Sequence, residues 1–254
     1  MPTPSSPPAP LLEIACFNEE SALVAADAGA GRIELCRDYA LGGLSPLPDS
    51  VRALKSLLSI PIYVMIRPHA HHFCYNDDDY ENMKLTMNAF KEQGADGFVF
   101  GILARSSGPG ETLLVDMARN KALVELADGR PCTFHRAFDL IPDSEWDAAL
   151  RAIAECGFQS ILTSGGPSGN SAVECTGQLD YLVHYQLDFS PSRCQRPEII
   201  VGGGVRSMNA ADVFQKTRAT AFHSAALSHT GEAVDADEVR ALRVALNEAC
   251  ANAT

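Results

Sequence analysis

The chain has 254 residues, a net charge of −12 and a hydrophobic fraction of 46%. A chain of this length buries roughly 70–75% of its unfolded surface, which is enough for a large core. Binding to nucleic acid or to anionic membranes depends on clustered Lys and Arg, so the acidic balance excludes both partners. Apolar runs also stay below the ~18 residues that a membrane-spanning helix needs.

Residues 1–10 are rich in Pro and Ser and carry neither positive charge nor an apolar stretch. This composition does not match a secretory signal and is typical of a disordered tail. We therefore predict a disordered tail over 1–10 and one folded domain over 11–254. The eight cysteines show no compact spacing, which favours reduced thiols and a cytoplasmic location.

Short apolar runs alternate with amphipathic stretches along the folded part of the chain. The runs predict strands at 11–16, 32–36, 61–67, 97–102, 132–136, 160–164, 198–202 and 221–224. The amphipathic stretches predict helices at 19–28, 50–58, 78–93, 112–127, 144–156, 172–187, 207–216 and 235–251. Asn18 stands where a helix N-cap is expected, and Gly157 where a C-cap is expected.

Eight strand–helix units with continuous apolar strands are typical of a parallel sheet that is covered on both faces. A doubly wound open sheet fits the same alternation. The count of eight and a length close to the ~250 residues of an α/β barrel favour the closed form. We predict an α/β fold that consists of a single (β/α)₈ TIM barrel.

TIM barrels carry their chemistry at the carboxyl ends of the strands. Glu13 and Glu34 lie within apolar strands, where alternate residues point into the barrel. A buried carboxylate needs a cation, a hydrogen bond or a proton. The candidate partners at other strand ends are Arg67, His135, Arg136 and His223. A buried ion-pair network would explain this set, but an active or binding site is our preferred interpretation.

These residue types can support several roles. His135 suits a general acid–base or a metal ligand, and Arg67 or Arg136 suits bidentate binding of a carboxylate or phosphate. Gly203 and Gly204 follow the seventh strand, where TIM barrels often bind phosphate, although a tight turn would also require glycine. All five lysines fall in helical stretches, which argues against a Schiff-base aldolase.

Sulfur and imidazole ligands form a third group. Cys16 and Cys36 end the first two strands, and a pair of thiolates is the ligand set that Cu(I) prefers. Buried cysteines often only pack, so packing remains the alternative. The loop after the third strand places His69, His71 and His72 close to Cys74, which suits either a metal or a solvated loop.

Several segments carry a family resemblance, among them LEIAC (12–16), GRIELC (31–36), TFHRAFD (133–139), LTSG (162–165), GGGV (202–205) and FHSA (222–225). With these segments the chain resembles the CutC family of copper homeostasis proteins, which have a TIM-barrel fold. The resemblance implies Cu(I) binding through Cys16 and Cys36. It also implies a functional cluster at Glu13, Glu34, Arg67, His135, Arg136, Asp139, Ser164 and His223. The family commonly continues Arg-Pro with Arg-Gly-Gly-Asp-Phe, whereas here 69–73 read His-Ala-His-His-Phe.

Two functions follow from these observations. The first is a copper homeostasis protein of the CutC type that binds Cu(I) through cysteine thiolates. The alternative is a TIM-barrel enzyme that acts on a small anionic or phosphorylated metabolite. Glu13, Glu34, Arg67, His135, Arg136, Asp139 and His223 would then be catalytic, and the anion site would consist of Ser164, Gly165, Gly203 and Gly204. Assembly into a homo-oligomer is a further expectation, because barrels often assemble.

Overall fold

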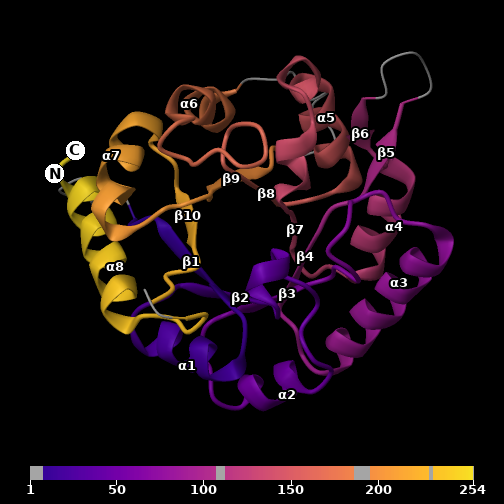
Figure 1. Ribbon diagram of the computed structural model, residues 1–254, viewed down its shortest axis with the longest axis horizontal. Coiled ribbons are helices and arrows are strands. Elements are labelled where there is room, and N and C mark those ends of the chain that lie inside the picture. Colours follow the sequence, from indigo (N-terminus) through magenta and orange to yellow (C-terminus); the bar gives the residue numbers. More distant parts are fainter. Residues whose placement is uncertain (1–7, 107–111, 186–194, 229–230, 254) are drawn as a thin grey trace, which may run out of the picture.

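The computed structural model describes residues 8–106, 112–185, 195–228 and 231–253, and a closed barrel of parallel strands lies at its centre (Figure 1). The strand order around the barrel is β1-β10-β9-β8-β7-β4-β3-β2, so the first and last strands pair and close it. The barrel strands are β1 (Leu11–Cys16), β2 (Arg32–Leu35), β3 (Ile62–Met65), β4 (Gly97–Phe100), β7 (Cys132–Phe134), β8 (Ser160–Thr163), β9 (Glu198–Val201) and β10 (Ala221–Ser224).

In the described part of the chain, eight α-helices surround the barrel as an outer ring (Figure 1). They are α1 (Glu19–Asp27), α2 (Ser50–Lys55), α3 (Asp77–Glu92), α4 (Met117–Leu126), α5 (Trp146–Cys156), α6 (Thr176–His184), α7 (Ser207–Thr217) and α8 (Ala236–Ala251). The predicted (β/α)₈ barrel is therefore confirmed.

Local signals begin and end these helices as expected. The Asn18 side chain accepts a hydrogen bond of 2.8 Å from the backbone N–H of Ser21 at the start of α1. Helix α5 ends at Gly157, whose φ of +94° lies in the left-handed region that favours glycine.

The structure differs from the predicted elements mainly between β4 and α4. Strands β5 (Leu103–Arg105) and β6 (Leu113–Val115) form an antiparallel pair there. The helix expected from residue 112 therefore begins only at Met117, where the Asp116 side chain caps it. The helix expected over 172–187 begins at Thr176, and its expected end lies outside the described residues.

Alternation along the barrel strands separates two buried layers. In β1, Leu12, Ile14 and Cys16 belong to the large apolar core between the barrel and the helices. Glu13 is also fully buried, but it stands between Leu12 and Ile14 in sequence and therefore faces the inner side of the strand. The barrel interior thus receives charged side chains, while the outer face of the strands remains apolar.

None of the helices in the described ranges has the length and hydropathy to cross a lipid bilayer. The five lysines all lie on helices, as the sequence predicts: Lys55 on α2, Lys84 and Lys91 on α3, Lys121 on α4 and Lys216 on α7. Residues 1–7 of the predicted tail lie outside the described residues, so the division into tail and barrel stays a prediction.

Candidate active site

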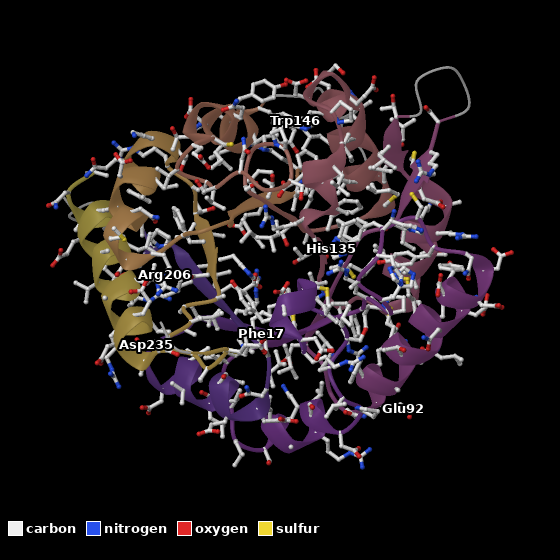
Figure 2. The ribbon with its side chains drawn as sticks, in the orientation of Figure 1. Phe17, Glu92, His135, Trp146, Arg206 and Asp235 are labelled. Carbon is white, nitrogen blue, oxygen red and sulfur yellow. The ribbon has the colours of Figure 1, made fainter. Side chains whose placement is uncertain are left out.

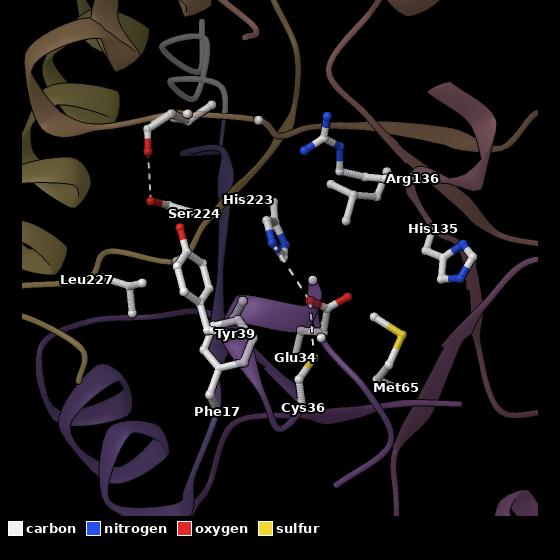
Figure 3. A pocket seen from close by; sticks show the side chains of 18 of the residues that line it. Phe17, Glu34, Cys36, Tyr39, Met65, His135, Arg136, His223, Ser224 and Leu227 are labelled. Atoms are coloured by element: carbon white, nitrogen blue, oxygen red, sulfur yellow. Dashed lines mark hydrogen bonds and ion pairs between the residues drawn. The ribbon is translucent and has the colours of Figure 1, made fainter. Parts of the chain in front are cut away.

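A cavity of about 350 Å³ opens at the carboxyl ends of the barrel strands (Figure 3). Figure 2 places His135 and Phe17 near this central opening, whereas Trp146 and Glu92 lie out in the helical ring. Of the predicted site residues, the cavity wall contains Glu34, Cys36, Arg67, His135, Arg136, Gly203, Gly204 and His223. Glu13, Cys16, Asp139, Ser164 and Gly165 are not part of the wall.

Glu13 is a buried carboxylate held between two cations. Its Oε2 accepts a hydrogen bond of 2.5 Å from Arg32 Nε, and its Oε1 lies 2.8 Å from His223 Nδ1. Burial alone would raise the pKa of Glu13, but the charges of Arg32 and His223 outweigh burial and hold it well below its usual range. Glu13 is therefore a carboxylate at neutral pH, and it fixes His223 from behind.

Glu34 has the same side chain in a different environment. Its Oε2 lies 3.7 Å from His223 Nε2 and accepts a hydrogen bond of 3.7 Å from Cys36 Sγ. Its Oε1 is buried without a hydrogen-bond partner. Burial raises the pKa of Glu34 to about 7, an effect that His223 opposes and the nearby Glu13 charge reinforces. Glu34 can therefore exchange a proton near neutral pH.

His223 lies between the two carboxylates, and Figure 3 shows it beside Glu34. Burial would lower its pKa, but Glu34 and Glu13 outweigh burial and raise it. Nδ1 donates to Glu13, which leaves Nε2 directed toward Glu34. The imidazole can thus carry a positive charge next to Glu34.

His135 is buried at the opposite side of the cavity. Its Nδ1 accepts a hydrogen bond of 3.3 Å from the backbone N–H of Ala137, and its Nε2 has no hydrogen-bond partner. Burial and the neighbouring Arg67 charge lower the pKa of His135 to about 3. The imidazole is therefore neutral at pH 7 and carries its proton on Nε2, so it can donate a hydrogen bond.

Arg67 is largely occupied by the backbone of the loop after β2. Its Nη1 donates to the carbonyls of Leu41, Gly42 and Gly43 at 2.9–3.2 Å, and its Nη2 donates to Ala70 at 3.3 Å. Arg67 therefore holds two loops of the cavity wall together, which is a positioning role.

Arg136 and Asp139 form a second polar group at the mouth. Arg136 Nε donates to Asp139 Oδ2 at 2.7 Å, and Nη2 donates to Ser164 Oγ at 3.2 Å. Asp139 also accepts hydrogen bonds from Thr163 Oγ1 and from the backbone and side chain of Ser164. Asp139 is buried, whereas the Arg136 side chain is 39% exposed. The Asp139 carboxylate thus orients the solvent-accessible Arg136 guanidinium at the cavity wall.

Gly203 and Gly204 bring backbone close to this arginine. Their φ values of +89° and +75° favour glycine. A side-chain carbon at Gly203 would also lie 2.7 Å from Ser164 Cβ, which is too close for another residue. Position 203 therefore requires glycine for steric reasons, and the turn exposes backbone to the cavity beside Arg136.

The two predicted copper ligands lie on different sides of the barrel wall. Cys36 lines the cavity, while Cys16 packs in the apolar core with Leu12 and Ile14. Their strand ends adjoin, because the backbone N–H of Cys36 donates to the Cys16 carbonyl at 2.8 Å. Burial and the Glu34 charge raise the pKa of both thiols, so both resist becoming thiolates.

Glu13, Glu34 and His223 offer ligand atoms that all lie within 4.8 Å of one another. Two carboxylates and an imidazole suit a divalent cation in chemical terms. Arg32 and His223 already neutralise Glu13, however, so a cation would have to compete with them.

Several residues in and behind the cavity wall are absent from the predicted set. Phe17 and Tyr39 pack edge to face at 5.1 Å beside the opening. Arg32 supplies the cation that stabilises Glu13 and also lies over the Tyr63 ring at 4.2 Å. Arg32 was detectable, because it stands two residues before Glu34 and therefore faces the same side of the strand.

The fold and this site define a TIM-barrel protein with a ligand-sized pocket, lined by charged and apolar side chains, at the carboxyl ends of the barrel strands. Residues 10–228 match the sequence profile of the CutC family. The copper homeostasis protein cutC homolog of Drosophila melanogaster is 35% identical over 87% of this chain and 79% of its own length. The human homolog of the same name is 34% identical, over 86% and 74%. This chain belongs to the CutC family.

Solved structures agree with this assignment. The crystal structure of CutC from Streptococcus agalactiae matches with a TM-score of 0.75 at 30% identity, covering 85% of this chain and 98% of that one. Phosphoribosylanthranilate isomerase from Thermotoga maritima matches with a TM-score of 0.59 at 13% identity, covering 93% and 98%. The second similarity shows the shared barrel fold alone.

Proposed function

We propose that the barrel mouth binds a small anionic metabolite and catalyses the removal of a proton from it. One observation carries this proposal: Glu34 has an unpartnered carboxyl oxygen and a pKa near 7, and it lies in the wall of the cavity beside His223. A group with a pKa near the working pH is the most effective general acid or base. An ionised carboxyl whose pKa remained near 4.5 would be a weaker base at this position.

Three residues form the proton-transfer unit in this proposal. Glu34 takes the proton from the substrate, while the positive charge of His223 stabilises the Glu34 carboxylate before transfer. Glu13 stays ionised and keeps His223 in the orientation that directs Nε2 toward Glu34. The neutral His135, on the opposite wall, can donate a hydrogen bond to a developing negative oxygen on the substrate.

The rest of the wall selects the substrate. Arg136 and the Gly203–Gly204 turn offer a guanidinium and close backbone for a phosphate or carboxylate. Phe17, Met65 and Phe73 provide an apolar surface for the body of the molecule. A cavity of about 350 Å³ has the size of sites for small ligands.

Ligand-induced thermal stabilisation tests the binding part. Inorganic phosphate, glycerol phosphate and ribose 5-phosphate would be the probes. At about 100 times its Kd a ligand stabilises by about 2.7 kcal/mol, a rise in Tm of roughly 5–10 °C for a chain of this size. Arg136→Gln should abolish the rise. Arg240→Gln should keep it, because Arg240 forms a similar ion pair with Asp237 at an exposed site on α8.

Exchange of substrate C–H protons in D₂O, followed by NMR, tests the chemical part. The wild type should catalyse exchange on a probe that binds, and Glu34→Gln should lose it because an amide cannot accept the proton. Failure of all three anions to raise the Tm would contradict the anion site. Exchange that persists in Glu34→Gln would contradict the role of Glu34.

Copper(I) binding is the second candidate function, and the relatives' names favour it. The Cys36 thiol lies at the cavity wall next to Glu34, and the Cys16 backbone adjoins it. A soft cation can displace the thiol protons despite the raised pKa values, as metals do in buried thiolate sites. Because Cys16 packs outward, a shared ion requires the end of β1 to rearrange. Cys36 would be the primary ligand.

An anaerobic Cu(I) titration against a competing chelator tests this candidate. The wild type should bind one equivalent, and the Cys16→Ser/Cys36→Ser double variant should lose it. Cys156→Ser is the matched control, since Cys156 is a buried thiol on α5 that bonds to the Met117 carbonyl. Binding that survives in the double variant would dismiss these two ligands. Under either function we also propose the cytoplasmic location and the homo-oligomer expected from the sequence.

A further inference from the structure

A second hollow lies beside the barrel mouth, on the far side of the loop that follows β3. It is lined by His69, His71, His72, Cys74, Tyr75, Asn76, Asp79 and Arg105. Three imidazoles and one carboxylate thus line a single hollow outside the site described above. Imidazole nitrogen is the commonest protein ligand for borderline divalent metals.

His69 is the centre of this group and has the hydrogen bonding of a metal ligand. Its Nε2 lies 3.3 Å from Asp79 Oδ2, so Nε2 carries the ring proton and donates it. In the neutral tautomer this leaves Nδ1 as the acceptor, and Nδ1 is buried without a hydrogen-bond partner. Histidines that bind metals generally donate the other ring N–H to a carboxylate in this way, which fixes the ring and raises its basicity.

Asp79 is fixed independently of His69. It occupies the third position of α3 and forms a capping box with Asn76. The Asp79 N–H donates to Asn76 Oδ1 at 2.8 Å, and the Asn76 N–H donates to Asp79 Oδ2 at 3.3 Å. The carboxylate that orients His69 is therefore held by the start of a sixteen-residue helix.

The other two imidazoles lie against His69. The ring of His71 is centred 5.1 Å from that of His69, and the ring of His72 is centred 5.8 Å away. Both are exposed, so their side chains can change rotamer rapidly. The three rings do not enclose a common point as Glu13, Glu34 and His223 do. Closure of the site requires rotation of His71 and His72, with His69 already oriented.

We propose that His69, His71 and His72 bind a divalent transition-metal ion of the zinc type, with Asp79 orienting His69. This site is separate from the proposed catalytic function and does not depend on it. His69 would ligate through Nδ1, and the two exposed imidazoles would supply the next ligands. Water can complete the coordination on the open side of the hollow.

The position of the site gives the metal a structural consequence. The same loop carries Arg67 and Phe73, which line the barrel cavity. Arg67 Nη2 also donates to the carbonyl of Ala70, between His69 and His71. A metal that ties the three imidazoles together would therefore restrain one wall of the cavity.

Zinc titration of the full-length protein against a chromophoric chelator is the direct test. One Zn²⁺ per chain is expected for the wild type. His69→Ala should weaken binding at least tenfold, and His71→Ala and His72→Ala should weaken it as well. Asp79→Asn should weaken it about 10–100-fold, as loss of an orienting carboxylate does elsewhere. The asparagine retains a side-chain oxygen for the helix cap, so α3 should persist.

Two variants serve as controls. His184→Ala removes an exposed histidine on α6 that also pairs with an aspartate, Asp180, and should leave zinc binding unchanged. Glu34→Gln should also leave it unchanged, because Glu34 belongs to the barrel-mouth group. Equal binding by His69→Ala and wild type, loss of binding in Glu34→Gln, or no uptake of zinc by the wild type would each overturn the proposal.

Discussion

Glu13 and Glu34 are chemically identical side chains whose pKa values are displaced in opposite directions. Arg32 lies 2.5 Å from Glu13 and keeps it ionised, whereas Glu34 has one oxygen without any partner. The charge of Glu13 further disfavours ionisation of Glu34. Two carboxyl groups with such different pKa values can have different roles in one site, because one holds a fixed charge while the other exchanges a proton.

This difference makes a prediction about stability and pH. The pKa of Glu34 is higher in the folded protein than in the unfolded chain, so its contribution to stability is present below about pH 4.5 and lost as the pH rises through about 7. Glu34→Gln removes that titration. Between pH 5 and 7 the wild type should therefore lose stability relative to the variant, by up to about 1.4 kcal/mol in the free energy of unfolding per pH unit.

Urea unfolding at pH 5, 6, 7 and 8 measures this gain. Glu125→Gln, at an exposed position on α4, should run parallel to the wild type over the same range. A difference in the free energy of unfolding between Glu34→Gln and wild type that stayed constant with pH would mean that Glu34 has the same pKa in the folded protein and the unfolded chain. That result would contradict the proposed role of Glu34 as the general base.

At the scale of elements, the sequence predicts the barrel because each barrel strand is a short apolar run bounded by turn residues. Where a strand has only three residues and stands directly before a helix, as β6 (Leu113–Val115) does before α4, its apolar pattern merges with that of the helix. Pairing with β5 makes this segment a strand, and local periodicity does not encode such pairing between separated residues.

The site could be predicted in part for the same reason. Strand-borne residues such as Glu34 and His223 meet because all parallel strands end at one mouth. Loop-borne side chains follow no such rule. The engagement of Arg67 with the carbonyls of 41–43, and the approach of His69 to Asp79 on α3, depend on tertiary packing. The sequence could supply these residues as candidates but not their contacts.

Adjacent strand ends also do not ensure that two side chains meet. Cys16 continues the alternation of Leu12 and Ile14 toward the helices, whereas Cys36 continues that of Arg32 and Glu34 toward the interior. Strand alternation alone accounts for this difference, because Cys16 stands three residues after the inward-facing Glu13 and Cys36 stands two residues after the inward-facing Glu34.

On the scale of the whole molecule, Glu13 joins the two ends of the barrel sequence. It lies on β1 and bonds to Arg32 on β2 and to His223 on β10, the last strand, which pairs with β1 to close the barrel. The site's fixed carboxylate is therefore also a contact across the closure. Loss of its charge would leave the buried Arg32 without its ion-pair partner and His223 with Glu34 as its remaining counter-charge.

Glu13→Gln should accordingly lower the free energy of unfolding by about 3–5 kcal/mol, the usual effect of removing one partner from a buried ion pair. Asp212→Asn breaks an exposed pair with Lys216 on α7 and should cost less than about 1 kcal/mol. Combining Glu13→Gln with Arg32→Met should cost less than the sum of the two single changes, because the double variant leaves no unpaired guanidinium. Urea unfolding at pH 7 of the wild type and these four variants measures the differences. If Glu13→Gln were as mild as Asp212→Asn, the Glu13 charge would be unimportant for barrel closure, and its role would be confined to orienting His223.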